Sequence, residues 1–341
     1  MDCCADCFGD RYLRREIIPK HSKASGRCSY CESEDVPVVV PRELAEYFEL
    51  LVSAYRSDPG GQILVHWFRE DWALFRHARM DDARATALLA EILDDGEIVR
   101  RTFLPASDPT VDRLSEWERF RDELMYHNRY FPEGTIDLDR LGSLLWYLEL
   151  NRDEIPTRWY RARLQPADTA FTPAEMGAPE KRIASHGRAN PAGIPYLYLG
   201  SDPTVAISEI RPHTGESACV AEFATPPDLR VVDLRSPRTT VSPFMLEDAT
   251  EIANMRNNLP LLGRLGDELT RPVIPQAAAI DYVPSQYLCE FIKKRGYQGV
   301  IYRSSVGEGI NLALFDPALA ACGAVTQYRV TRVAVSIDPE Q

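Results

Sequence analysis

Apolar positions in the first half of the chain recur at steps of three and four residues, as they do on one face of an α-helix. Residues 41–55 follow this step after Pro41, and residues 85–93 follow it after an Asp81-Asp82 start. Two further helical stretches cover 114–130 and 136–150. Turns rich in proline and glycine separate them. The pattern predicts a helical domain over residues 36–155.

From Pro156 onward the apolar runs become short and typical of strands. They cover 159–164, 196–199, 219–224, 230–234, 299–303, 312–315 and 327–337. Helical stretches at 204–210, 243–258 and 284–295 lie between them. The fold class predicted for the whole chain is therefore α+β, with a mixed α/β domain over residues 156–341.

Composition and charge narrow the range of functions. The chain has 341 residues, of which 45% are hydrophobic and 26% charged, which is typical of a folded globular protein. No apolar run approaches the ~20 residues of a membrane helix, and no signal segment is present, so we expect a cytoplasmic protein without a membrane partner. Residues 36–155 carry −10 of the net charge of −12. This acidity disfavours a nucleic-acid partner, because phosphate backbones need Lys or Arg for neutralisation.

Five of the eight cysteines lie in the first 31 residues. Cys4 and Cys7 form one CxxC pair, and Cys28 and Cys31 form a second pair after twenty intervening residues. This spacing is typical of a zinc ribbon, in which two thiolate pairs complete a Cys4 shell around one Zn²⁺ ion. A closed Cys4 site is structural rather than catalytic, and it would stabilise residues 1–35 as a zinc module.

Other arrangements of this module stay open. Cys3 could replace Cys4 if the knuckle shifts by one residue, and His21 is a lesser candidate ligand. Two disulfides are the other alternative, which an unsecreted chain disfavours.

A second motif, from Arg121 to His127, fits the Arg, polar residue, short gap and His pattern of HEPN ribonucleases. Six residues correspond to about 240° around one helix, so the two side chains do not share a tight face and their joint use would need a homodimer. The alternative is a solvated helix face with a histidine at the edge of the core. The acidity of this segment also counts against ribonuclease activity.

Several polar residues of the second domain lie where a purely structural sequence rarely places them. Arg161 and Arg163 share one face of a predicted strand, either as an outward pair or as a fork for a diphosphate. Asp202 before Pro203 is typical of a helix N-cap. Val205 and Ala206 then place Glu209 beside apolar positions on an inward face, unless it is a helix-edge residue paired with an arginine.

At the other end of this domain, Ser304 and Ser305 follow a predicted strand and precede glycines, which suits close approach of a ligand. A plain hairpin is the alternative interpretation of this stretch.

Together these residues resemble the RES domain family. The likeness covers about residues 157–320 and rests on the strand WYRAR, on GRANPAGIPYLYLGSDPTVAISEIRP, and on GYQGVIYRSS with INLALFD. It implies an ADP-ribosyltransferase-like fold with NAD⁺ as substrate. The family arginine corresponds to Arg161, with Arg188 as a second NAD⁺-contacting arginine. The tyrosine corresponds to Tyr198, the glutamate to Glu209 and the serine to Ser304, with a shift to Ser305 left open. The N-terminal cysteines and helices resemble a HEPN-like domain found fused to RES domains.

The resemblance implies an NAD⁺-degrading toxin or defence effector that uses hydrolysis or phosphorolysis. Either a separate antitoxin or the N-terminal half of the chain itself would hold such an activity in check. An ADP-ribosyltransferase acting on a protein target is the first alternative, and a ribonuclease or a non-catalytic partner-binding module are the others. In the NAD⁺ hypothesis Glu209 stabilises positive charge on the ribose, and Arg161 and Arg188 neutralise the diphosphate. Tyr198 stacks on the nicotinamide or its ribose, and Ser304 donates a hydrogen bond on the nicotinamide side. No GxGxxG loop is present, which disfavours a redox NAD enzyme.

Overall fold

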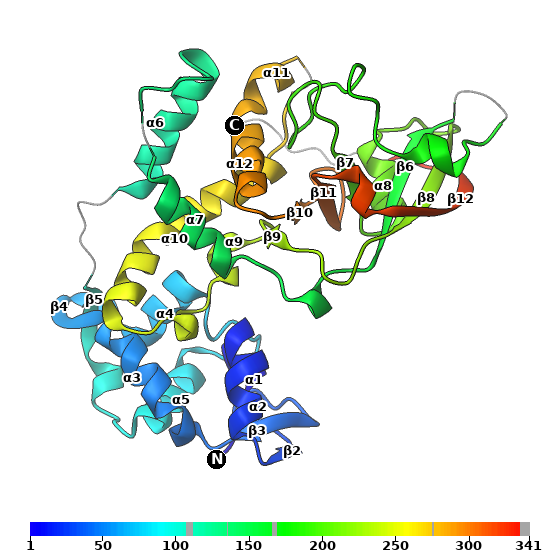
Figure 1. The fold of residues 1–341 in the computed structure, drawn as a ribbon. Helices are drawn as coiled ribbons and strands as arrows, with labels where there is room; N and C mark the ends of the chain where they lie inside the picture. Colours follow the sequence, from blue (N-terminus) through cyan, green and yellow to red (C-terminus); the bar gives the residue numbers. More distant parts are fainter. Residues whose placement is uncertain (107–111, 135, 166–168, 275, 335–341) are drawn as a thin grey trace. The chain divides into compact units, whose positions relative to one another are not determined.

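The fold was analysed in a computed structural model, which describes residues 1–106, 112–134, 136–165, 169–274 and 276–334 (Figure 1). The chain divides into two compact units, each of them discontinuous in sequence. Unit 1 contains Met1–Glu116 and Arg238–Leu262, and unit 2 contains Trp117–Pro237 and Gly263–Gln341. The mixed α+β class is as predicted. The units differ from the predicted domains, since residues 117–155 belong with the C-terminal sheet and residues 238–262 belong with the N-terminal unit.

Unit 1 combines two small sheets with short helices. Its strands are β1 (Cys3–Cys4), β2 (Ala24–Gly26), β3 (Val36–Val39), β4 (Tyr55–Ile63) and β5 (Thr102–Pro105), in the sheet orders β1-β3-β2 and β4-β5. Its helices are α1 (Ala5–Phe8), α2 (Ile18–His21), α3 (Ala45–Ser53), α4 (Leu64–Trp72) and α5 (Asp82–Leu93), with short helical turns η1 (Leu13–Ile17), η2 (Pro41–Leu44) and η3 (Ile98–Arg100). The chain returns to this unit with α9 (Pro237–Thr240), η6 (Pro243–Met245) and the first part of α10 (Ala249–Thr270).

Aromatic side chains from both sequence segments form the core of unit 1. Phe48 packs against Phe8 and Phe244 with ring centroids 5.4 and 5.0 Å apart. The helical periodicity read from the sequence is confirmed in α5, where Ala85, Leu88, Leu89 and Ile92 are buried. Asp81 caps this helix by accepting a hydrogen bond from the backbone N–H of Arg84 at 2.8 Å.

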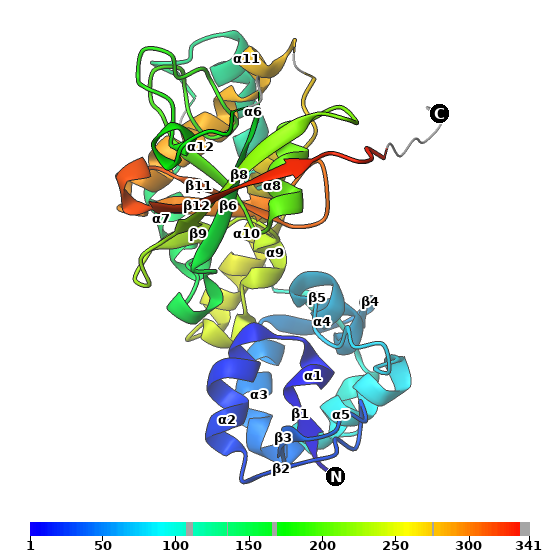
Figure 2. The same ribbon diagram turned by 90° about the vertical axis from the view of Figure 1, so that its right-hand side faces the viewer.

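Unit 2 is built around a seven-stranded sheet of order β12-β8-β6-β7-β11-β10-β9 (Figures 1 and 2). Its strands are β6 (Arg158–Leu164), β7 (Leu197–Gly200), β8 (Ser217–Ala224), β9 (Val231–Asp233), β10 (Gly299–Arg303), β11 (Ile310–Leu314) and β12 (Ala321–Arg329). Its helices are α6 (Arg113–Tyr126), α7 (Leu138–Tyr147), α8 (Pro203–Glu209), α11 (Ala278–Asp281) and α12 (Val283–Lys294), with short turns η4 (Arg152–Glu154), η5 (Pro173–Met176) and η7 (Pro317–Leu319). The last strand ends at Arg329 instead of continuing along the predicted run 327–337, whose residues 335–337 lie outside the described part of the chain.

The sheet is least tightly paired between β6 and β7. The register of β6 with β8 runs from Arg158 to Leu164, whereas its register with β7 consists of the single pair Tyr160 and Gly200. One face of the sheet is covered by a core that includes Trp159, Leu199 and Leu312. Helices α8 and α12 pack against the sheet near β6 and β10. The separation of β6 from β7 therefore leaves polar backbone and side chains free to line a cavity.

None of the helices in the described ranges combines the length and the apolar character that crossing a membrane requires.

Candidate functional site

A cavity of about 460 Å³ lies in unit 2 where β6 and β7 separate, which is within the size range of small-molecule sites. Four of the five residues predicted for the NAD⁺ site line it, namely Arg161, Arg188, Tyr198 and Glu209. The fifth, Ser304, is next to the cavity and donates a hydrogen bond to the carboxylate of Glu209. Residues that are up to 143 positions apart in the sequence, from Arg161 to Ser304, thus meet at one place.

Glu209 is the last residue of α8, a helix that follows β7 almost directly. Asp202 caps the helix by accepting from the backbone N–H of Val205 at 3.0 Å, as the sequence predicts. Oε1 of Glu209 accepts hydrogen bonds from Ser304 Oγ at 2.7 Å and from Asn311 Nδ2 at 2.6 Å. Glu209 lines the cavity and is exposed to solvent there, and its two hydrogen-bond partners are neutral rather than an arginine.

The two consecutive serines contact different groups. Ser304 donates to Glu209, whereas Ser305 lines the cavity and its Oγ accepts from Arg188 Nη2 at 3.3 Å. The turn that carries both is closed by a hydrogen bond from the backbone N–H of Ser304 to the carbonyl of Gly309 at 3.0 Å. The short hairpin between β10 and β11 therefore contacts both the acidic and a basic side of the cavity.

Arg161 extends from β6 towards β7. Its Nη1 donates to the carbonyl of Tyr198 at 3.3 Å, and its Nε is buried without a hydrogen-bond partner among the described residues. Burial, with a smaller contribution from the charge of Arg163, lowers the pKa of Arg161 to about 10, which leaves the guanidinium protonated at neutral pH. A buried cation with an unused donor favours an anionic ligand. Of the predicted alternatives, the outward Arg161–Arg163 pair is wrong for Arg161, because this residue lines the cavity.

Arg188 lies on a loop that two side chains of α12 hold in place. Ser285 Oγ donates to the carbonyl of Arg188 at 2.6 Å, and Gln286 Nε2 donates to the carbonyl of Gly187 at 2.9 Å. The guanidinium donates to the carbonyl of Arg271 at 2.7 Å and lies 5.3 Å from the ring centroid of Tyr282. These contacts hold one face of the guanidinium and aim it into the cavity.

Tyr198 fixes the same loop from the sheet. Its hydroxyl donates to Asn190 Oδ1 at 2.7 Å and accepts from the backbone N–H of Ala189 at 2.9 Å. Burial raises the pKa of Tyr198 above its ordinary value, so the phenol stays protonated and can donate. The hydroxyl is therefore committed to the loop, and the predicted stacking of the ring on a substrate stays a prediction.

The charged side chains that line the cavity are three arginines (Arg161, Arg188 and Arg211) and Glu209, a formal charge of +2 with His186 neutral. This matches a ligand that carries two negative charges. Arg211 and Asn311 also line this cavity, and neither was predicted from the sequence. Asn311 had a signal in the sequence, because it is the one polar residue in the apolar run Ile-Asn-Leu-Ala-Leu of β11.

Comparison with known proteins identifies this part of the chain. The model of the RES domain matches residues 158–333, which is just over half of the sequence. The chain belongs to the RES domain family. A solved structure, that of the M. tuberculosis MbcT–MbcA toxin–antitoxin complex, is similar over 55% of this chain and 92% of the matched chain, with 15% identity and a TM-score of 0.32. No curated protein matches the sequence.

Outside the RES cavity, the structure does not bring Arg121 and His127 together. Arg121 lies on α6 with Nε 3.2 Å from Oε1 of the buried Glu268, which also pairs with Arg264 at 3.2 Å. His127 is exposed just beyond the end of α6. Arg121 and His127 point in different directions around the helix axis, Arg121 towards a buried ion-pair network and His127 towards solvent. The two side chains therefore form no shared site among the described residues.

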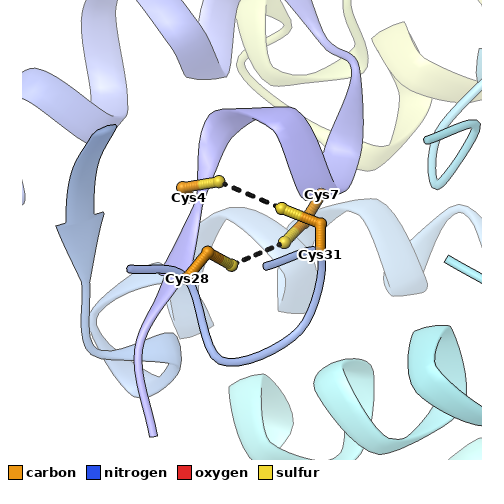
Figure 3. A group of neighbouring side chains, drawn as sticks. All are labelled: Cys4, Cys7, Cys28 and Cys31. Carbon is orange, nitrogen blue, oxygen red and sulfur yellow. Dashed lines mark hydrogen bonds between the residues drawn. The ribbon is translucent and has the colours of Figure 1, made fainter. Parts of the chain in front are cut away.

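The N-terminal cysteines form a cluster of candidate metal ligands in unit 1 (Figure 3). The Sγ atoms of Cys4, Cys7, Cys28 and Cys31 lie within 4.8 Å of one another, and all four residues are buried. Cys4 and Cys31 are 3.4 Å apart and Cys7 and Cys28 are 3.3 Å apart, so neither pair is a disulfide. The predicted grouping of these four residues is thus confirmed as a geometric cluster.

The two other candidate ligands lie outside this cluster. Cys3 is buried but is not part of the cluster, and the ring of His21 packs against Tyr47 instead. The second knuckle is tied to α5, since Arg84 Nη1 donates to the carbonyl of Tyr30 at 3.1 Å.

Proposed function

We propose that this RES protein cleaves the nicotinamide–ribose bond of NAD⁺, as an NAD⁺-degrading toxin or defence effector. The observation that carries the proposal is the environment of Glu209, whose Oε1 is fixed by two neutral donors in a cavity of net positive charge. The described residues make no hydrogen bond to its Oε2, which leaves that oxygen available to a substrate. Membership of the RES family supports NAD⁺ as that substrate.

The chemistry of the bond suits one positioned carboxylate. When the bond between ribose C1′ and the nicotinamide nitrogen breaks, the electron pair leaves with nicotinamide, which becomes neutral, and positive charge develops on the ribose. Glu209 Oε2 would stabilise this charge and orient the incoming nucleophile. Attack by water gives ADP-ribose and a proton, and attack by phosphate gives ADP-ribose 1″-phosphate. Neither route needs a covalent enzyme intermediate.

The arginines would hold the diphosphate. Arg161 offers its unpartnered Nε, and Arg188 is anchored on Arg271 and Tyr282. Ser304 would act by holding Glu209, a different role from the direct contact with nicotinamide that the resemblance implies. The likeness to ADP-ribosyltransferases stays a prediction.

The test is an NMR or mass-spectrometric time course of NAD⁺ with the purified full-length protein, with and without phosphate and with and without cell lysate. Release of nicotinamide is expected, and the other product identifies the acceptor. Glu209→Gln should lower the rate by about 10²- to 10³-fold with unchanged folding, because the charge facing the ribose is lost. Glu180→Gln, at an exposed residue that does not line the cavity, is the matched control. Absence of nicotinamide release under all conditions would refute the proposal.

The same experiment separates the alternatives. Label transferred to a lysate protein would indicate an ADP-ribosyltransferase, and binding of NAD⁺ without product would indicate a non-catalytic module. A neutralising antitoxin and a homodimer stay predicted partners, without a contact in the chain that favours either.

We also propose that the four-cysteine cluster of unit 1 binds one structural Zn²⁺ ion. A tetrahedral site with Zn–S bonds of ~2.3 Å separates its sulfurs by roughly 3.8 Å, and the cluster lies in this range. Four thiolates complete the shell, so the ion would stabilise the fold of unit 1 and take no part in the chemistry of the RES cavity.

A further inference from the structure

A buried asparagine in the middle of the RES sheet contacts the glutamate of the cavity. Asn311 is 4% exposed and lies in β11, between β7 and β10. Its cross-strand neighbours are Gly200 in β7 and Tyr302 in β10. A polar side chain at such a position destabilises the fold unless it is hydrogen-bonded, and Asn311 Nδ2 donates to Glu209 Oε1 at 2.6 Å.

The glycine opposite Asn311 explains how the helix reaches the strand. Paired residues on neighbouring strands point to the same face of a sheet, so Gly200 leaves the space beside Asn311 open. A Cβ atom at Gly200 would lie 2.9 Å from the backbone nitrogen of Ala206, which means that α8 packs directly on the strand. Glu209 follows Ala206 by almost one helical turn. The strand register and this close packing together bring the carboxylate to the amide.

We propose that Asn311 is a positioning residue, which holds Oε1 of Glu209 so that Oε2 faces the substrate. This inference rests on the proposed function. The chemistry of the side chain fits the role, because an amide donates a hydrogen bond without carrying a charge. A lysine or arginine there would neutralise the carboxylate that the reaction needs, and an acid would repel it.

Asn311 and Ser304 both donate to Oε1, but their supports differ. Ser304 lies in the exposed turn between β10 and β11, and its Oγ also accepts from the backbone N–H of Val306 at 3.3 Å. Asn311 lies on a strand that is hydrogen-bonded on both sides. We therefore assign the larger share of the orientation of Glu209 to Asn311, and Asn311→Ala should lower kcat more than Ser304→Ala.

The test compares Asn311→Ala and Asn311→Asp in the full-length protein, with NAD⁺ as substrate. Asn311→Ala should lower kcat by about 10- to 100-fold, with a smaller effect on KM, because the diphosphate-binding arginines are untouched. Asn311→Asp has the same shape but places a second carboxyl group against Glu209. Two carboxyl groups at this distance share one proton, and a protonated Asp can donate as Asn does.

The ratio of kcat in Asn311→Asp to kcat in wild type should therefore rise as the pH falls from 8 to 5. The other ionisable groups that line the cavity, Arg161, Arg188, Arg211, His186 and the tyrosines, are the same in both proteins, so the ratio reports the change made at position 311. Asn128→Asp, at an exposed loop residue, adds the same charge outside the cavity and should leave both the rate and its pH profile unchanged.

Unchanged kcat in Asn311→Ala, or a pH-independent ratio for Asn311→Asp, would overturn the inference while leaving the proposed function intact. If the wild type releases no nicotinamide, the proposed function fails, and a double-mutant cycle of Asn311→Ala with Glu209→Ala, which removes the acceptor altogether, decides the contact separately in urea unfolding. Non-additive shifts of the unfolding midpoint support the hydrogen bond on which the inference depends, and additive shifts refute it.

Discussion

Gly187 offers the sharpest test of how the RES cavity is built. A Cβ atom at this position would lie 2.5 Å from Asn190 Oδ1 and 2.6 Å from the hydroxyl oxygen of Tyr198. Side-chain contacts of this kind below 3.0 Å are essentially never seen. Gly187→Ala therefore forces both oxygens, or the backbone that carries the new Cβ, to move by roughly half an ångström, as over-packed sites do.

Neither oxygen is free to move. The Tyr198 hydroxyl and Asn190 are hydrogen-bonded to each other at 2.7 Å, and the same hydroxyl accepts from the backbone N–H of Ala189. We expect Gly187→Ala to lower the free energy of unfolding by about 1–3 kcal/mol. Because Arg188 is the next residue, its guanidinium shifts as well, and the rate of NAD⁺ cleavage should fall by about 10- to 100-fold.

The measurements are urea unfolding and the nicotinamide-release assay on the same preparations. Gly263→Ala is the matched control, because a Cβ at this position in α10 meets nothing within 4 Å. That change should stabilise the helix by about 0.5–1 kcal/mol and leave the rate unchanged. A Gly187→Ala protein as stable and as active as wild type would show that Tyr198 and Asn190 do not clamp the loop.

Two further predictions concern unit 1. Purified protein should contain about one Zn²⁺ per chain, and Cys28→Ser or a strong chelator should remove the ion and lower the melting temperature; metal-free protein with unchanged melting would contradict the zinc site. Burial raises the pKa of Asp10 above its ordinary value of 3.8. As the pH rises above 3.8, the unfolded chain loses this proton before the folded protein does, so the free energy of unfolding falls. Asp10→Asn keeps an oxygen that accepts from Leu13 N–H and from Ser242, but it carries no charge at any pH. In urea unfolding the variant should be as stable as wild type near pH 3.5 and more stable than wild type at pH 7. An equal difference in stability at both pH values would refute this.

Local features of the fold could be predicted from the sequence. The spacing of Ala85, Leu88 and Ile92 and the cap at Asp81 lie within one helix, and the structure contains that helix. The two CxxC knuckles are equally local, since a two-residue gap fixes where both thiols of a pair point. Arg161, Arg188, Tyr198 and Glu209 of the RES cavity could be named because they lie in short, distinctive motifs.

Long-range features could not be predicted in the same way. Nothing near Asn311 in the sequence indicates that Gly200 lies opposite it, because strand register depends on pairing between segments more than a hundred residues apart. The same holds for the single pair that joins β6 to β7 and opens the cavity. Helix α4 was missed because its apolar residues lie on both sides of a charged stretch, Arg69-Glu70-Asp71, and Asp71 is buried against Arg256 from the other half of the chain.

The two compact units also depend on contacts between distant segments. A change in composition near Pro156 marks a change from helices to strands, but it does not mark which core a helix joins. Residues 117–155 belong to unit 2, and the backbone N–H of Leu150 donates to the carbonyl of Val231 in β9 at 3.2 Å.

The discontinuity of unit 1 has a consequence for synthesis of the chain on the ribosome. Its core needs Phe244 and the first part of α10, so it cannot close until residue 262 has left the exit tunnel. At that moment the strands β6 to β9 of unit 2 have emerged from the tunnel, but β10 and β11 have not. Glu209 therefore waits without Ser304 and Asn311, and an incomplete nascent chain lacks the assembled cavity. The proposed cleavage of NAD⁺ would in this way require almost complete translation of the chain.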